Sequence, residues 1–144
     1  MKRTLDIGIQ HGSCVDFDGR GVLILGSSGS GKSSLALACI SIGANLVGDD
    51  YIDLGVCDDA ILARRPPNIE GLIEVARVGV LNCDFIESTK LALAIDMSQA
   101  EVVRMPPRRH IALQGCGIPL IYGANIPYLH SVAFQFVTAG RADV

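Results

Sequence analysis

The sequence predicts an α/β domain with a mixed sheet, and two observations support this fold class. The first is an apolar run at residues 22–25 that leads through a glycine-rich loop into a helical pattern at residues 33–40. The second is the excess of short apolar segments of strand length over helical segments. An even alternation of strands and helices would instead indicate a regular doubly wound sheet.

In the first third of the chain, residues 11–17 and 22–25 are expected to form two strands joined by a hairpin turn at Asp18 and Gly19. The helix that starts near Lys32 is expected to end near Gly43, which is a suitable C-cap. A short strand follows at residues 46–47.

The remainder of the chain reads mostly as strands. A hairpin is expected around Asp58 and Asp59, which we interpret as turn residues. Pro-Pro pairs predict loops at residues 64–68 and 105–109, since proline continues neither a helix nor a central strand. The expected strands are residues 51–54, 60–63, 72–75, 78–81, 90–96, 111–113 and 118–122, and a second helix is expected at residues 127–139.

Length and composition favour one globular domain over residues 1–144. Hydrophobic residues make up 49% of the chain and charged residues 19%, which argues against disorder. The net charge of −3 gives no support for nucleic acid as a partner. No apolar run is long enough for a membrane span, and the N-terminus is a poor signal peptide. The five cysteines form no C-x-x-C pair, so we interpret them as small apolar fillers in a cytoplasmic protein.

The glycine-rich loop matches the pattern G-x-x-x-x-G-K-[ST], which is typical of phosphate-binding loops. It comprises Gly26, Ser27, Ser28, Gly29, Ser30, Gly31, Lys32 and Ser33. Glycines allow several backbone N–H groups to point at one anion, and the N-terminus of the following helix adds positive potential. Lys32 can reach the β and γ phosphates, and the Ser33 hydroxyl can bind Mg²⁺. The motif therefore predicts a nucleoside triphosphate as the ligand.

Two adjacent acids, Asp49 and Asp50, follow the short strand after the predicted helix. One carboxylate could hold a metal ion, directly or through water, and its neighbour could accept a proton from an attacking hydroxyl. The alternative is a solvated turn, because Gly-Asp-Asp is ordinary turn composition. His11 and Glu74 are further candidates, although a lone histidine is more often structural or simply exposed.

Taken together, these motifs resemble the catalytic domain of HPr kinase/phosphorylase. The resemblance comprises His11-Gly12, the loop motif and residues 46–50 in the same order and spacing, and it continues more loosely to about residue 82. Members of this family phosphorylate a serine of HPr, the phosphocarrier protein of the sugar phosphotransferase system. Some also remove that phosphate by phosphorolysis, and the fold resembles phosphoenolpyruvate carboxykinase.

The resemblance implies ATP and Mg²⁺ as cofactors and assigns roles residue by residue. His11 and Lys32 would be active-site residues, and Ser33 and Glu74 would hold Mg²⁺. Asp50, or its neighbour Asp49, would accept the proton in the kinase direction. The expected function is an ATP-dependent serine kinase acting on HPr; the alternative is a nucleotide-sensing module without catalysis.

Three departures from the family pattern bear on this expectation. Ala76-Arg77 stands where the family has Arg-Gly, and a one-residue shift in a strand turns a side chain to the other face. The N-terminal regulatory domain of long members is not expected here, as in the short forms of some proteobacteria. Arg104 or Arg109 would replace an arginine of the longer C-terminal part, and assembly into a homo-oligomer is left open.

Overall fold

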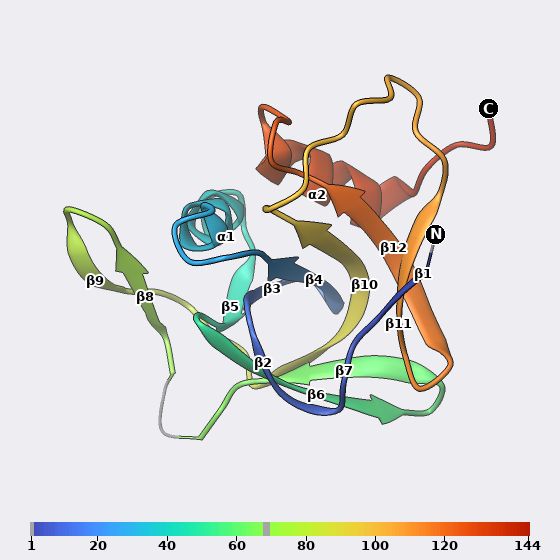
Figure 1. Cartoon of the computed structure of the whole chain (residues 1–144). Coiled ribbons are helices and arrows are strands. Elements are labelled where there is room, and N and C mark those ends of the chain that lie inside the picture. Colours follow the sequence, from blue (N-terminus) through green and yellow to red (C-terminus); the bar gives the residue numbers. More distant parts are fainter. Residues whose placement is uncertain (1, 68–69) are drawn as a thin grey trace.

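The computed structural model describes residues 2–67 and 70–144, and it confirms a mixed α/β fold with one large sheet and two helices (Figure 1). The helices are α1 (Lys32–Ser41) and α2 (Leu129–Ala139). The strands are β1 (Lys2–Thr4), β2 (Gly8–His11), β3 (Ser13–Phe17), β4 (Arg20–Leu25), β5 (Asn45–Gly48), β6 (Tyr51–Cys57), β7 (Ala60–Arg64), β8 (Leu72–Val75), β9 (Gly79–Asn82), β10 (Ser88–Asp96), β11 (Arg109–Leu113) and β12 (Cys116–Tyr122).

The central path of the large sheet runs β1-β11-β12-β10-β4-β3-β5. Strand β10 pairs in parallel with both β4 and β12, whereas β3 pairs antiparallel with β4 and β5. The first part of β10 also pairs with β7, which continues through β6 to β2. The sheet therefore carries β4, the strand before the glycine loop, between β10 and β3.

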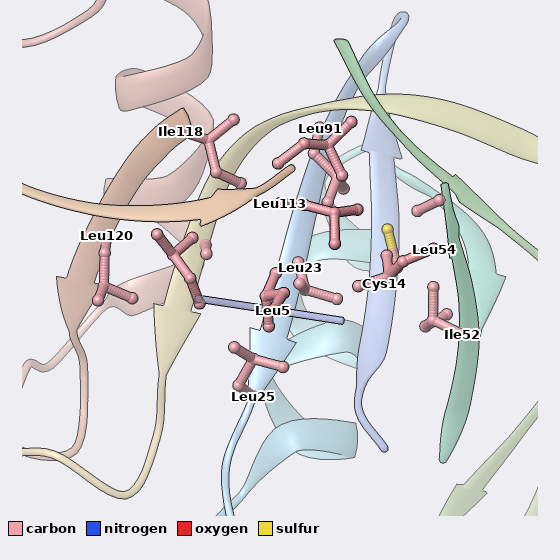
Figure 2. Packing of buried hydrophobic residues seen from close by; sticks show 14 of the residues in the cluster. Leu5, Cys14, Leu23, Leu25, Ile52, Leu54, Leu91, Leu113, Ile118 and Leu120 are labelled. Carbon is pink, nitrogen blue, oxygen red and sulfur yellow. The ribbon is translucent and has the colours of Figure 1, made fainter. Parts of the chain in front are cut away.

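Alternating side chains of the central strands fill two separate cores. Leu23 and Leu25 of β4 lie in the core shown in Figure 2, against residues such as Ile52 and Leu54 of β6. Val22 and Ile24 lie in the other core, which α1 and α2 cover. Each buried leucine or isoleucine contributes roughly 1.5–3 kcal/mol, so both faces of β4 are firmly held.

Most expected elements are confirmed, with differences at their ends. The strand expected at residues 11–17 is interrupted at Gly12, whose Cβ position would lie 2.8 Å from the carbonyl oxygen of Ile24. His11 therefore ends β2 instead of opening β3. Strand β1 was not predicted, because it has only three residues and forms by pairing with the distant strand β11. The loop expected at residues 64–68 starts after Arg64, and Asn68 lies outside the described residues.

Strands β8 and β9 form a two-stranded hairpin separate from the large sheet. The hairpin extends away from the body of the molecule, beside α1 (Figure 1). Within the described part of the chain, no helix is both long and apolar enough to cross a membrane.

Candidate functional site

The glycine loop connects the end of β4 to the first residue of α1. Gly26 has a φ of 147°, and a Cβ there would lie 2.5 Å from Ser30 Oγ and 3.1 Å from Met97 Cβ. Gly31 stands at the N-cap of α1 in the left-handed conformation, with a φ of 101°. The backbone curvature of this loop therefore requires glycine at the first position and favours it at the last.

Lys32 occupies an unusual electrostatic position at the start of α1. Only 7% of the residue is exposed, and its ammonium donates a hydrogen bond to the carbonyl oxygen of Ser27 at 2.9 Å. No carboxylate pairs with it among residues 2–67 and 70–144. A nearly buried cation normally has a counter-charge, so this position favours binding of an anion.

The two adjacent acids have different environments. Asp49 Oδ1 accepts hydrogen bonds from the hydroxyls of Ser13 and Ser33, both at 2.8 Å. Asp49 Oδ2 accepts a third bond from the backbone N–H of Glu74 at 3.2 Å. Asp50 is exposed and has a left-handed φ of 71°, and its carbonyl oxygen accepts the N–H of Gly12 at 2.8 Å. The Asp49 carboxylate is thus held in place, while that of Asp50 faces solvent.

A cleft of about 370 Å³ brings together most of the predicted site residues, and we call it the site cleft. Its walls include His11, Lys32, Ser33, Asp50 and Glu74, together with glycines of the loop. Asp49 does not line it and instead contacts Ser33 and the backbone of Glu74 from the side. Residues that are up to 63 positions apart, from His11 to Glu74, therefore meet around the loop.

A second cleft of about 510 Å³ borders the beginning of the glycine loop. Gly26 and Ser27 line it, and His11 lines both clefts. The His11 ring also packs against Tyr51, with 5.7 Å between ring centroids. His11 consequently stands where the two clefts meet.

Asp96, Ser98 and Arg3 anchor the loop from the second cleft, and the motifs gave no reason to select them. Ser98 Oγ accepts the backbone N–H of Ser27 at 2.8 Å, and Ser98 in turn donates its own N–H to Asp96 Oδ1 at 2.9 Å. Arg3 forms an ion pair with the buried Asp96 carboxylate. The only sequence signal was an acid at the end of the apolar strand β10.

Glu74 lines the site cleft from β8. The argument that a one-residue shift turns the Arg77 side chain to the other face of a strand is wrong. Ala76 and Arg77 lie in the turn between β8 and β9, so the alternation of faces along a strand does not apply to them. Ala76 lines the site cleft with Glu74 and Val75, while Arg77 is exposed and has a left-handed φ of 68°. The displaced arginine therefore sits at the tip of the hairpin.

Replacing Arg77 with Gly should raise the free energy of unfolding by about 0.5–1 kcal/mol. Glycine adopts the left-handed conformation without steric cost, although it gains more freedom in the unfolded chain. Urea denaturation measures the change, and Arg77→Ala is the matched control because alanine keeps the strained backbone. Equal stabilisation by both variants, or destabilisation by Arg77→Gly, would contradict this reading of the turn.

Neither candidate C-terminal arginine lines the site cleft. The Arg109 guanidinium donates to Glu101 Oε1 at 2.6 Å and Oε2 at 3.3 Å, and it lies 4.4 Å from the centre of the Tyr122 ring. Arg104 is exposed in the loop before β11. In this arrangement Arg109 has a structural role, and a phosphate contact by Arg104 stays a prediction.

Only some of the cysteines are the small apolar fillers that the sequence predicts. Cys14 and Cys39 are buried, and burial raises the pKa of the Cys39 thiol to about 12, whereas Cys57 is exposed. Burial, and then the charges of Asp84 and Asp49, raise the pKa of the Cys83 thiol. Cys83 therefore stays protonated and is a poor nucleophile, although it lies near the Asp49 carboxylate.

Comparisons with known proteins identify the family of this chain. Residues 6–103 match the family described as HPr Serine kinase C-terminal domain. HPr kinase/phosphorylase from Cupriavidus necator is 47% identical over 142 residues, which cover 91% of this chain and 41% of that protein. HPr kinase/phosphorylase 1 from Oceanobacillus iheyensis is 44% identical over 73 residues, which cover 50% of this chain and 24% of that protein.

A solved structure shares the fold. The Hpr(Ser) kinase/phosphatase from Coxiella burnetii aligns with a TM-score of 0.74 at 25% identity, covering 90% of this chain and 93% of that chain. This chain spans less than half the length of the two relatives named above. The match over residues 6–103 and the likeness in sequence and fold show that the chain belongs to the HPr serine kinase C-terminal domain family.

Proposed function

We propose that this chain is an ATP-dependent protein kinase that phosphorylates a serine of the phosphocarrier protein HPr. The observation that carries the proposal is the site cleft, which Lys32, Ser33 and Asp50 line together. In the described part of the chain the nearly buried Lys32 ammonium has no carboxylate partner. Membership of the HPr serine kinase family supports HPr as the acceptor.

The triphosphate of ATP would bind to the loop that precedes α1. Its phosphates would supply the counter-charge that Lys32 lacks among the described residues. The N–H groups of the loop would donate hydrogen bonds to the phosphates, and the N-terminus of α1 would add positive potential. The first turn of α1 contains no acidic side chain that would repel a phosphate.

The residues around Ser33 also fit Mg²⁺. This ion prefers oxygen ligands and usually takes one or two carboxylates, with phosphates and waters completing its shell. Ser33, Glu74 and, behind them, Asp49 offer such oxygens. Within residues 2–67 and 70–144 no three His, Cys, Asp or Glu side chains form a metal site, so the protein would supply only part of the shell. When bound, Mg²⁺ would neutralise charge on the phosphates.

Asp50 would act as the general base. Asp50 lines the site cleft, whereas the three donors on Asp49 leave that neighbour poorly placed to take a proton. The serine oxygen would attack the γ phosphorus in line, its proton would pass to Asp50, and ADP would leave. In phosphorolysis, inorganic phosphate would attack the phosphorus of phosphoserine and form pyrophosphate. Asp50 would then donate a proton to the serine oxygen that leaves.

The acceptor serine would enter from the second cleft. That cleft is polar, adjoins the first residues of the glycine loop and meets the site cleft at His11. His11 would then contact the transferred phosphoryl group or the acceptor at the junction. A cytoplasmic location, one domain over residues 1–144, likeness to phosphoenolpyruvate carboxykinase and assembly into a homo-oligomer remain predictions.

The experiment that tests this proposal is incubation of the chain with HPr and ATP labelled at the γ phosphate. We expect label on HPr that disappears when the target serine is replaced with alanine and that depends on Mg²⁺. Addition of inorganic phosphate to labelled HPr tests phosphorolysis in the same assay. ATP binding without any label on HPr would refute the kinase and support a nucleotide-sensing module.

A further inference from the structure

Ser13 is a buried polar residue of the central sheet. It opens β3, next to Cys14 and Val15, and it is fully buried with 0% exposure. Its hydroxyl donates to Asp49 Oδ1 at 2.8 Å. No motif in the sequence distinguishes this serine from a residue that simply fills the core.

The position of Ser13 in the sheet links two parts of the site. Ser13 pairs with Ile24 of β4, which leads into the glycine loop, and its neighbour Cys14 pairs with Gly48 of β5, which leads into Asp49. Backbone hydrogen bonds on both sides of β3 therefore fix where the Ser13 hydroxyl lies. Ser33, by contrast, belongs to the loop motif, and its hydroxyl oxygen would become a metal ligand.

The three donors leave Asp49 with little orientational freedom. A carboxylate offers about four lone-pair positions, and two hydroxyls and one backbone N–H occupy three of them. The two hydroxyls share Oδ1, so the remaining position belongs to Oδ2. Which lone pair stays free for a metal-bound water thus depends on Ser13 holding Oδ1.

We propose that Ser13 is a positioning residue that sets the orientation of the Asp49 carboxylate toward Ser33 and the magnesium ion of a bound nucleotide. This inference rests on the proposed function. With the Ser13 hydroxyl present, Asp49 can accept hydrogen bonds from the Ser33 hydroxyl and from the Glu74 N–H at once. Without it, the carboxylate can rotate, and the oxygens near the metal lose their fixed geometry.

The test compares nucleotide affinity with Mg²⁺ and with EDTA, using a fluorescent ATP analogue and no acceptor protein. We expect Ser13→Ala to reduce the tightening by Mg²⁺ about tenfold, the low end of effects seen when a partner of a metal ligand is removed. Affinity in EDTA should stay within about twofold of wild type. Ser13→Cys keeps the size of the residue with a weak donor and should show the same loss, so it replaces Ser13→Ala if that variant does not fold.

Thr89→Val is the matched control. Thr89 is also buried and donates to a buried aspartate, Asp16, at 2.6 Å, but it lies away from both clefts. This variant should lower the Tm and leave the tightening by Mg²⁺ unchanged. Full tightening in both Ser13 variants would overturn the proposal and leave Ser13 a purely structural residue. Absence of ATP binding by the wild-type chain would instead refute the proposed function.

Discussion

Replacement of Asp50 by asparagine should reduce phosphate transfer to HPr by at least about 10²–10⁴-fold, the contribution of a positioned general base. The amide cannot accept the serine proton, while its shape is nearly that of the carboxylate. ATP affinity should stay within about twofold, because Lys32, Ser33 and the loop are unchanged. Transfer is measured with labelled ATP, and affinity is measured on the same preparation.

The same variant should keep its fold, because asparagine tolerates the left-handed backbone that Asp50 adopts, with a φ of 71°. Asp50→Ala is the matched control and should lose about 1 kcal/mol of unfolding free energy, since alanine pays the full steric cost. Normal transfer by Asp50→Asn would contradict the role assigned to this residue. Loss of ATP binding would show that Asp50 acts on the nucleotide instead.

Replacement of Asp49 by asparagine should affect nucleotide binding and stability, which the Asp50→Asn variant should leave nearly unchanged. An amide offers one oxygen and one NH₂, so at least one of the present donors loses its acceptor or must turn. If the NH₂ faces the hydroxyls, the Ser33 oxygen becomes an acceptor and its lone pair is withdrawn from the metal. We expect the tightening of ATP binding by Mg²⁺ to fall by at least tenfold, with about 1 kcal/mol lost from the unfolding free energy.

An Mg²⁺ titration of nucleotide binding and a urea denaturation curve check both effects. Asp49→Asn should differ from Asp50→Asn in each measurement, because Asp49 accepts three hydrogen bonds whereas Asp50 is exposed and lines the site cleft. Wild-type Mg²⁺ dependence in Asp49→Asn would contradict its proposed link to the metal.

The sequence could predict the loop, the helix after it and the β6–β7 hairpin, because local chemistry determines them. Glycines, an apolar run and a turn pair act over a few residues and leave a readable pattern. The grouping of His11, Lys32, Asp50 and Glu74 around the loop came from the family resemblance, and all four line the site cleft.

What could not be predicted depends on contacts between distant parts of the chain. The donors on Asp49 lie 36, 16 and 25 positions away in sequence, so nothing near Asp49 and Asp50 distinguishes their environments. The family resemblance made Arg109 a candidate for phosphate contact, yet its guanidinium binds Glu101 and stacks on Tyr122. The argument from a one-residue shift treated Arg77 as part of a strand, but the hairpin turns there.

The division of work between Asp49 and Asp50 is tested most directly by a crystal structure of the chain with Mg²⁺ and a non-hydrolysable ATP analogue. We predict Mg²⁺ about 2.1 Å from Ser33 Oγ, with Asp49 hydrogen-bonded to Ser33 or to a metal-bound water. The Asp50 carboxylate should face the γ phosphate from the wall of the site cleft. A metal ion bound by Asp50, with Asp49 turned away from Ser33, would contradict this account.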